Sequence, residues 1–490
     1  MTPCSRRTFL KAAGAAAAAA MAPRWLAAGE PTARRLNFVF VLMDDLGQRD
    51  VGCFGSTFYE TPSIDRLAAE GMRFTSGYAA CPVCSPTRAS IMAGKYPARL
   101  NITNFIAGMK SGKLVPPEYR HELPLEEFTV GEAFKDGGYT TCFIGKWHLG
   151  GPEYYPDKQG FQTTVAVAAG CGGYFSPYKN FLKDTPPGEY LTDRLTDESL
   201  KFIDAAKGQP FFLYLSHYAV HIPLQAKKDL AAKYAAKAAQ LPPVEAKFIP
   251  EGNVKARQVQ DHPVYAAMVQ SMDESVGRIM KKLEELGLED HTAIIFMSDN
   301  GGLSTAEGTP TANVPLRGGK GWLYEGGIRE PLIIKWPGVT KPGARCDVPV
   351  TSTDFYPTLL EMAGLPLRPK QHVDGVSIVP LLRGGQSLPR QAIYWHYPHY
   401  ANQGGSPGGV VRAGDYKLIE FYEDNRVELY NLKDDLGEKN DLAARMPEKA
   451  KELRERLARW RQEVGARMPT PAPAAAKAVM PTAEEIASGE

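Results

Sequence analysis

Apolar runs and amphipathic stretches alternate through most of the chain. Residues 36–45, LNFVFVLMDD, form an unbroken apolar run that ends in acid, which is typical of a β-strand buried on both faces. Residues 61–71 follow as a short helix that ends at a glycine. The same alternation predicts, in order, a helix near 129–136, a strand at 139–144, a helix at 193–206 and a strand at 211–216. This order predicts a layered α/β domain.

The longest predicted helix covers residues 262–286. Its apolar positions keep a helical spacing up to a glycine: Tyr265, Met268, Val269, Met272, Val276, Ile279, Met280 and Leu283. A strand at residues 292–300, TAIIFMSDN, follows the helix. From about residue 385, short apolar segments are separated by Gly, Asp and Asn, and a charged helix over residues 447–464 comes after them. This last part predicts an antiparallel meander closed by a helix.

Changes in composition and in hydrophobic pattern along the chain predict four segments. These are a signal peptide at residues 1–30, a large α/β domain at 31–384, an antiparallel-sheet subdomain at 385–466, and a disordered tail rich in Pro and Ala at 467–490. In the first segment, Arg6 and Arg7 stand just ahead of a weakly apolar run at residues 12–20, which is typical of a twin-arginine export signal. A chance Arg-Arg pair ahead of an Ala-rich tail is the alternative.

The export signal predicts where the mature chain is found. Its apolar run is shorter than the ~20 residues that span a bilayer, so we expect no stable membrane insertion. We expect the Tat export machinery to deliver the folded chain to the periplasm or the medium. Of seven cysteines, Cys4 leaves with the signal, and the other six are too scattered for a disulfide scaffold, although one or two bridges are allowed.

The charge balance limits the classes of partner. The 490 residues include 57 Lys and Arg against 55 Asp and Glu, a net charge of +2. This balance provides no general attraction for nucleic acid or for an anionic membrane, so we expect neither as a partner. Any preference for an anion must therefore come from a local site.

Two predicted strands end in oxygen ligands. Asp44 and Asp45 follow the first strand, and Asp299 and Asn300 follow the strand near residue 292. Neighbouring residues of a regular strand point to opposite faces, so each pair can converge only where the strand breaks, and the glycines at 47, 301 and 302 predict that break. Three carboxylates and one amide favour Ca²⁺ or Mg²⁺ over Zn²⁺. The alternative is that these residues only cap turns or helices.

The stretch ACPVCSPTRASIMAG, residues 80–94, poses a separate question about its cysteines. A structural zinc site built on this pair needs a second pair of ligands, and the chain has no other CxxC. A phosphatase-type thiolate loop needs five residues between Cys and Arg, whereas Cys84 and Arg88 are separated by three and Cys81 and Arg88 by six. A CxxC redox pair stays open, without a thioredoxin-like pattern beside it.

The same stretch resembles the signature of the type I sulfatases, in the alkaline-phosphatase-like superfamily. A second stretch, GYTTCFIGKWH at residues 138–148, is similar to their second signature, and RGGKGWLYEGGIREP at 317–331 extends the likeness. The resemblance covers roughly residues 36–465. It implies an α/β fold with a large central mixed β-sheet flanked by helices, and a smaller C-terminal domain with an antiparallel sheet and a helix.

The resemblance also implies a mechanism in which Cys84 does not act as a thiol. In this family a formylglycine-generating enzyme oxidises that cysteine to an aldehyde, whose hydrate attacks the sulfur of a sulfate ester and releases the alcohol. Its second hydroxyl then loses a proton, the aldehyde re-forms and sulfate leaves. Such a site must offer cations as well as a strong nucleophile, because the anionic oxygens of a sulfate ester repel attack.

Residue by residue, the resemblance implies two overlapping sets. The metal ligands, for calcium or alternatively magnesium, are Asp44, Asp45, Cys84, Asp299 and Asn300. The catalytic residues are Cys84, Arg88, Lys146, His148, His221 and Lys320. We expect Arg88 to orient the aldehyde hydrate, Lys146 and Lys320 to bind sulfate oxygens, and His148 to act as the base. His221 is the expected general acid at the leaving-group oxygen.

The remaining histidines and Cys81 receive no catalytic assignment. His217, four residues before His221, is interpreted as structural and Cys81 as packing. His396 and His399 either reach the substrate from the C-terminal region or belong to an aromatic strand packed on the main domain. The function predicted is an exported sulfatase acting on sulfated polysaccharides or their oligosaccharides. The alternatives are a phosphate or phosphonate monoesterase on the same scaffold and an inactive protein that binds sulfated glycans.

Overall fold

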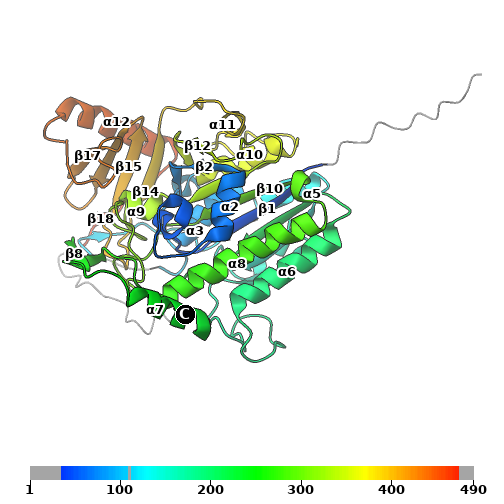
Figure 1. Cartoon of the computed structure of the whole chain (residues 1–490). Helices are drawn as coiled ribbons and strands as arrows, with labels where there is room; N and C mark the ends of the chain where they lie inside the picture. The colour runs from blue at the N-terminus through cyan, green and yellow to red at the C-terminus, as the bar shows by residue number, and fades with distance from the viewer. Residues whose placement is uncertain (1–34, 109–111, 474–490) are drawn as a thin grey trace, which may run out of the picture. The chain divides into compact units, whose positions relative to one another are not determined.

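A mixed sheet of eight strands forms the centre of the chain from Leu36 onward (Figure 1). The structure is a computed structural model and describes residues 35–108 and 112–473, so the predicted signal peptide lies outside the described residues. Across the sheet the strands follow the order β12 (Ala344–Cys346), β2 (Met72–Phe74), β11 (Leu332–Lys335), β10 (Thr292–Ser298), β1 (Asn37–Met43), β7 (Phe211–Ser216), β5 (Thr140–Lys146) and β6 (Thr163–Ala168).

The central strands of this sheet run parallel. Strand β1 pairs with β10, where Met43 lies opposite Ser298, and with β7, where Leu42 lies opposite Ser216. Strands β5 and β6 continue the parallel part, whereas β11 runs antiparallel to both β10 and β2. The carboxyl ends of β1, β10, β7 and β5 therefore meet at one edge, where ligands of open α/β sheets usually bind.

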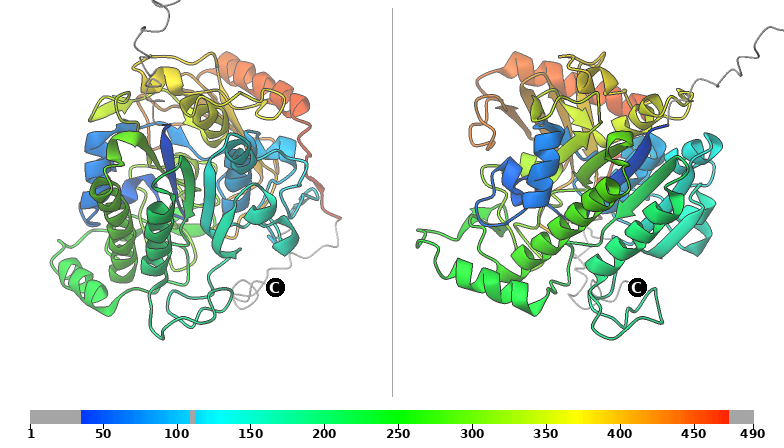
Figure 2. Two further views of the ribbon diagram at one scale, coloured as in Figure 1. Left: turned by 90° about the vertical axis from the view of Figure 1, so that its right-hand side faces the viewer. Right: turned by 45° about the vertical axis from the view of Figure 1, so that its right-hand side comes forward.

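Helices cover both faces of the sheet (Figure 2). One face carries α6 (Leu191–Ala206) and α8 (Pro263–Glu285), and the other carries α3 (Cys84–Ala93), α5 (Val130–Asp136) and α10 (Phe355–Met362). Side chains of β1 alternate between the faces, with Val39 and Val41 toward α6 and α8, and Phe38 and Phe40 toward the other layer. Because both faces are covered, the strand is apolar at every position.

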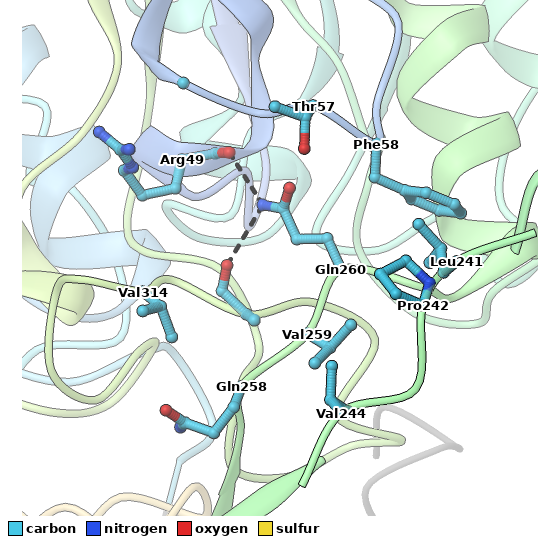
Figure 3. A pocket seen from close by; sticks show the side chains of 12 residues that line it. Arg49, Thr57, Phe58, Leu241, Pro242, Val244, Gln258, Val259, Gln260 and Val314 are labelled. Carbon is cyan, nitrogen blue, oxygen red and sulfur yellow. Dashed lines mark hydrogen bonds between the residues drawn. The ribbon is translucent and has the colours of Figure 1, made fainter. Parts of the chain in front are cut away.

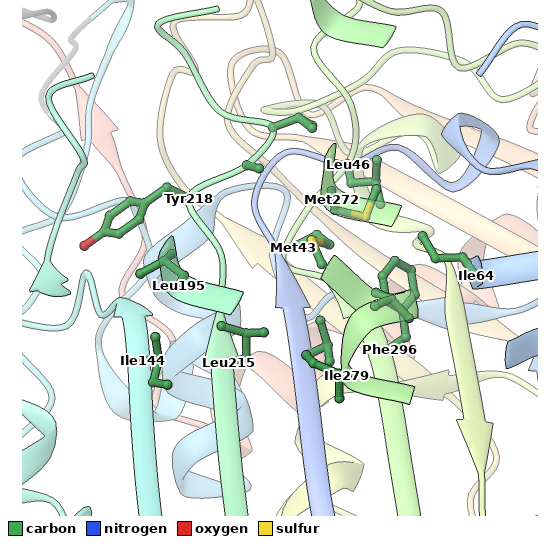
Figure 4. Close-up of a cluster of buried hydrophobic side chains, with 14 of the residues drawn as sticks. Met43, Leu46, Ile64, Ile144, Leu195, Leu215, Tyr218, Met272, Ile279 and Phe296 are labelled. Atoms are coloured by element: carbon green, nitrogen blue, oxygen red, sulfur yellow. The ribbon is translucent and has the colours of Figure 1, made fainter. Parts of the chain in front are cut away.

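The core between β1 and α8 is closely packed (Figure 4). Met43, Leu215 and Phe296 of three adjacent strands face Met272 and Ile279 of α8, and all five are at most 1% exposed. Burying side chains of this size contributes about 1.5–3 kcal/mol each. This rigid layer lies directly beneath the edge at which the parallel strands end.

The C-terminal region forms a four-stranded antiparallel sheet, β14 (Ile393–Tyr397), β15 (Gly408–Ala413), β16 (Tyr416–Phe421) and β17 (Val427–Asn431). Helix α12 (Pro447–Glu463) packs on it through Leu453, Leu457 and Trp460. The start of the predicted disordered tail differs from expectation, because β18 (Thr470–Pro471) pairs with β4 (Leu114–Val115). Residues 474–490 lie outside the described residues, and the boundary at 384/385 stays a prediction.

The shorter elements connect these layers. They are α2 (Pro62–Glu70), β3 (Gly77–Tyr78), α4 (Pro97–Leu100), α7 (Lys228–Ala238), β8 (Phe248–Glu251), β9 (Val254–Arg257), α9 (Glu325–Ile328), β13 (Val350–Thr351) and α11 (Val379–Leu382). The predicted helices and strands are confirmed, with shifts at their ends. The strand predicted at 139–144 continues to Lys146, because its last residues still pair with β6 and β7.

Candidate active site

The four predicted oxygen ligands converge at the ends of β1 and β10. Asp44, Asp45, Asp299 and Asn300 are each 0% exposed. The amide Nδ2 of Asn300 donates to Oδ1 of Asp45 at 2.8 Å, and the backbone N–H of Asp45 donates to Oδ1 of Asp299 at 3.3 Å. Two strand ends separated by more than 250 residues thus form one buried cluster.

The left-handed turn after β1 lies at Asp45 and not at the expected Gly47. Asp45 itself takes the left-handed conformation, with φ of 62°, whereas Gly47 has an ordinary φ of −68°. Gly301 serves close approach instead, because a Cβ there would come within 1.8 Å of the carbonyl oxygen of Gly326. The turn of the backbone at Asp45 brings two neighbouring carboxylates to the same side.

Cys84 begins helix α3 and faces this cluster. Its Sγ lies 3.5 Å from Oδ1 of Asp44, 4.0 Å from Oδ1 of Asp45 and 3.6 Å from Nζ of Lys146. The side chain is 1% exposed. Burial, with the negative charge of Asp299, holds the pKa of the thiol well above its ordinary value. An unmodified Cys84 is therefore a protonated thiol and a weak nucleophile.

Arg88 lies one helical turn beyond Cys84 and braces the cluster. Its Nε and Nη2 lie 2.8 and 2.7 Å from Oδ2 of Asp299. Its Nη1 donates to the carbonyl oxygen of Lys146 at 2.9 Å and to Oγ of Ser216 at 2.6 Å. Burial raises the pKa of Asp299 to about 6, against the opposing charge of Arg88. The arginine therefore ties together the ends of three strands.

Two buried lysines complete the set of cations. Nζ of Lys146 lies 2.6 Å from Oδ2 of Asp44, and Nζ of Lys320 lies 2.8 Å from Oδ2 of Asp45. The lysines are 2% and 4% exposed. Burial opposes their charge, but the neighbouring carboxylates outweigh it and raise the pKa of both. Both therefore stay protonated at neutral pH.

The charges of this cluster balance before any ligand is added. Three carboxylates, Asp44, Asp45 and Asp299, face three cations, Arg88, Lys146 and Lys320. Buried charges need such pairing, because desolvation of an unpaired ion costs several kcal/mol. With a divalent cation bound, the net charge of the cluster would be +2, which suits an anionic substrate.

The two predicted catalytic histidines lie beside the charged cluster. Nε2 of His221 is 3.6 Å from Oδ2 of Asp45, and its Nδ1 is 2.8 Å from the carbonyl oxygen of Ile222. Burial and the charge of Lys320 lower the pKa of His221 to about 4. His148 has a φ of 56° and places Nε2 3.4 Å from the carbonyl oxygen of Ile106. Burial and the charge of Lys146 hold its pKa well below the ordinary value.

The other histidines have partners elsewhere. Nε2 of His217 is 3.0 Å from Oγ of Ser275 on α8. His396 contacts the hydroxyl of Tyr422 and the carbonyl of Arg467, and Nε2 of His399 is 2.8 Å from Oγ1 of Thr103. Cys81 is 1% exposed within an apolar cluster. All six cysteines in the described part of the chain are free thiols.

The donor set fits a hard cation. Ligand atoms of Asp44, Asp45, Cys84 and His221 lie within 4.8 Å of one another, so these residues could hold a metal ion. The Oδ1 atom of Asn300 is also buried without a hydrogen-bond partner, although its Nδ2 is bonded. A buried amide oxygen without a donor is costly unless a cation or water meets it. His221 enters this grouping in addition to the predicted ligands.

Ser216 was not among the predicted site residues. It accepts from Arg88 and donates to the carbonyl oxygen of Lys146 at 2.7 Å. Its position at the end of the apolar run FFLYLS, on the same edge as the aspartates, is a signal that could have identified it.

A separate cavity of about 270 Å³ lies outside this cluster (Figure 3). None of the predicted site residues lines it. The side-chain amide of Gln260 lies at one side of the cavity. Its Nε2 donates to the carbonyl oxygens of Arg49 at 2.9 Å and Ala312 at 3.2 Å. Phe58 and Pro242 provide an apolar wall.

Comparison with known families agrees with the geometry. The family described as Sulfatase matches residues 36–365, and the family described as N-sulphoglucosamine sulphohydrolase, C-terminal, matches residues 319–463. The signal sequence of the twin-arginine translocation pathway matches residues 3–23, so the protein is exported to the periplasm or beyond. Within the described residues, no helix is long and apolar enough to cross a membrane.

Individual relatives span most of the chain. A protein named Sulfatase from Formosa agariphila is 33% identical over 492 residues, covering 84% of this chain and 85% of its own. Arylsulfatase A of Homo sapiens is 32% identical over 435 residues, covering 81% and 77%. The solved structure of Ps i-CgsB in complex with k-i-k-neocarrahexaose is similar with a TM-score of 0.71 and 28% identity, over 87% of this chain and 93% of that chain.

These matches cover both the α/β domain and the C-terminal sheet. The fold agrees as well, with a mixed central sheet between helices and a smaller antiparallel sheet with a helix. Sulfatases generally use a metal ion and a formylglycine, and the buried acidic cluster is a possible metal site. The chain belongs to the sulfatase family and is an exported sulfuric ester hydrolase.

Proposed function

We propose that this sulfatase acts on sulfate esters of polysaccharides or their oligosaccharides, with Cys84 as the precursor of its nucleophile. The observation that carries the proposal is the position of Cys84, whose Sγ lies 3.5 Å from Oδ1 of Asp44 and 3.6 Å from Nζ of Lys146. The saccharide complex of the related Ps i-CgsB supports a carbohydrate substrate. An exported enzyme also meets polysaccharides that do not enter the cell.

The proposed metal ligands are Asp44, Asp45, Cys84, Asp299 and Asn300. We favour calcium over magnesium, since several carboxylates and an amide in a compact cluster suit its larger and more flexible coordination. The bound cation would supply positive charge beside the reacting sulfate group. The unpartnered Oδ1 of Asn300 supports its place in this set.

The remaining residues would handle the nucleophile and the sulfate. We propose that a formylglycine-generating enzyme oxidises Cys84 to formylglycine, and that Arg88 holds the hydrated aldehyde in place. Lys146 and Lys320, which keep their positive charge in the buried cluster, would bind sulfate oxygens. The attack then expels the sugar alcohol, and loss of a proton from the hydrate re-forms the aldehyde with release of sulfate.

The two histidines suit two different proton transfers. His148 is neutral at pH 7 and its Nδ1 is buried without a partner, so it can accept a proton. His221 is more open, with 28% of its side chain exposed. Its Nδ1 faces the carbonyl of Ile222, so a proton on Nε2 requires a positively charged ring. The negative charge of a bound sulfate would favour that form, and His221 could then protonate the departing oxygen.

Peptide mass spectrometry tests the activation step. Trypsin releases residues 74–88, which contain both Cys81 and Cys84. We expect a mass loss of ~18 Da at Cys84 when the protein is made with a formylglycine-generating enzyme, and an alkylatable thiol at Cys81. An unmodified Cys84 in an active enzyme would overturn the mechanism.

Kinetics with matched esters tests the reaction class. We expect turnover of 4-nitrophenyl sulfate well above that of 4-nitrophenyl phosphate, and loss of turnover by at least ~10³-fold in Cys84→Ala. A wide preference for phosphate would favour a phosphate or phosphonate monoesterase. Full biological function of Cys84→Ala would favour a protein that only binds sulfated glycans.

A further inference from the structure

Glu307 occupies an unusual position in the loop that follows Asn300. It is half-buried, and its φ of 53° is uncommon for a residue other than glycine. The next residue, Gly308, is exposed. A backbone held in this region costs about 1–3 kcal/mol and persists where the surrounding structure imposes it. The surroundings of Glu307 show what holds it.

Gln403, from the loop between β14 and β15, fixes the Glu307 carboxylate. Its Nε2 donates to Oε1 of Glu307, and the side chain is 2% exposed. The indole Nε1 of Trp322 donates to the carbonyl oxygen of Gln403 at 2.9 Å and to Oγ1 of Thr305 at 3.1 Å. Trp322 therefore joins the loop of Glu307 to the loop of Gln403, and a loop of the C-terminal sheet orients a carboxylate of the α/β domain.

This carboxylate lies next to the predicted sulfate-binding residues. Gly321, which follows Lys320, contacts Gln403 so closely that a Cβ there would come within 2.5 Å of its Oε1. Glu307 is thus connected through Gln403 to the residue that follows Lys320, beside the proposed sulfate-binding site.

The Oε1 atom of Gln403 is buried beside Gly321 and has no hydrogen-bond partner among the described residues. Gln403 therefore positions Glu307, and the half-buried carboxylate of Glu307 is the acceptor that this loop offers. A carboxylate accepts hydrogen bonds from hydroxyl groups and repels anions.

We propose that Glu307, oriented by Gln403, binds hydroxyl groups of the sugar that carries the scissile sulfate. This inference rests on the proposed function and names its substrate more closely. The carboxylate favours a sugar with free hydroxyls beside the ester and disfavours one with a second sulfate or a carboxylate there. Glu307 is then a specificity-determining residue outside the sulfate-binding cluster.

The test compares two substrates in Glu307→Gln. One is a monosulfated hexose, and the other is 4-nitrophenyl sulfate, whose leaving group has no hydroxyls. We expect the ratio of kcat/KM for the sugar to kcat/KM for the aryl ester to fall about 10–100-fold, as for loss of a hydrogen bond to a charged group. The rate on a disulfated hexose relative to the monosulfated one should rise. Gln403→Ala should change both ratios in the same direction.

The matched control is Glu245→Gln, which removes a carboxylate from an exposed position. It should leave both ratios unchanged, and thermal unfolding should show that all variants are folded. Equal losses on sugar and aryl ester would overturn the inference. So would an altered dependence on leaving-group acidity across aryl sulfates, which would mean that Glu307 acts through His221. A wild type active only on aryl esters would overturn both this inference and the saccharide substrate of the proposed function. A wild type that hydrolyses the sugar sulfate but shows no change of ratio in Glu307→Gln would overturn this inference alone.

Discussion

Nζ of Lys146 lies 2.6 Å from Oδ2 of Asp44, and the two side chains are 2% and 0% exposed. Removing Lys146 leaves the buried carboxylate of Asp44 with the more distant Nη2 of Arg88, 3.7 Å from its Oδ1. A buried charge that has lost its close partner is costly. We expect Lys146→Ala to lower the free energy of unfolding by about 3–5 kcal/mol, measured by urea denaturation. We also expect kcat/KM for an aryl sulfate to fall about 10²–10³-fold, since a cation beside the reacting group is lost.

Lys335 provides the control for this prediction. Its Nζ also lies 2.6 Å from a carboxylate, Oε2 of Glu70, but the side chains are 17% and 30% exposed. Pairs open to water contribute about 0–1 kcal/mol, so Lys335→Ala should change the unfolding free energy little. Equal effects of the two substitutions would show that burial does not decide how much such a pair contributes to stability.

The orphaned oxygen of Asn300 predicts an effect on metal binding. We expect chelation to lower the Tm of the wild type and added calcium to restore it, because a ligand of the folded state stabilises it by mass action. In Asn300→Ala the Kd for calcium, measured by titration calorimetry, should rise at least ~10-fold. Asn180→Ala, at an exposed position, should keep the wild-type Kd. An unchanged Kd in Asn300→Ala would remove this residue from the ligand set.

If His221 is the general acid, the rate loss in His221→Gln should depend on the acidity of the leaving group. A general acid matters most when the departing alcohol is a weak acid, so His221→Gln should lose about 10²–10⁴-fold on a sugar sulfate and less on 4-nitrophenyl sulfate. A series of aryl sulfates of graded acidity would show a steeper slope for the variant. His217→Gln, which alters the contact with Ser275, should affect stability and leave the slope unchanged. Parallel slopes for His221→Gln and wild type would exclude the acid role.

Asp273 on α8 predicts a pH dependence of stability. Its carboxylate accepts from the backbone N–H groups of Ser63 and Ile64 at the start of α2, yet burial raises its pKa to about 6. The unfolded chain loses this proton near pH 4 and the folded chain near pH 6. The free energy of unfolding should therefore fall by about 2–3 kcal/mol as the pH rises through this window.

The comparison of wild type with Asp273→Asn isolates this effect. The variant should lack that fall between pH 4 and 6 in urea denaturation, because its side chain does not titrate. Asp290→Asn, at an exposed position, should follow the wild-type profile. A wild type whose stability rises over the same window relative to Asp273→Asn would show that the pKa of Asp273 is lowered instead.

The sequence predicted most elements and the chemistry of the site. The run from residue 36 to the aspartates is apolar throughout because β1 is covered on both faces, and α8 keeps its helical spacing because one side packs on the sheet. The stretch around Cys84 indicated the family together with the second stretch at residues 138–148 and the two pairs of oxygen ligands. Asp299 was a candidate because it ends an apolar run, whereas Lys146 was a candidate because its surroundings resemble the second signature of the family.

Only the tertiary structure decided how these residues meet. The left-handed turn at Asp45, the bond from Arg88 to Asp299 across 211 residues and the bridge from Gln403 to Glu307 have no local signature. Periodicity reports which face of an element is buried, whereas contacts between distant segments depend on strand order and loop paths. The sequence by itself therefore determined the helices, the strands and the residue types available to the site. The packing of the sheet determined which charges are paired and which buried oxygen atoms have no hydrogen-bond partner.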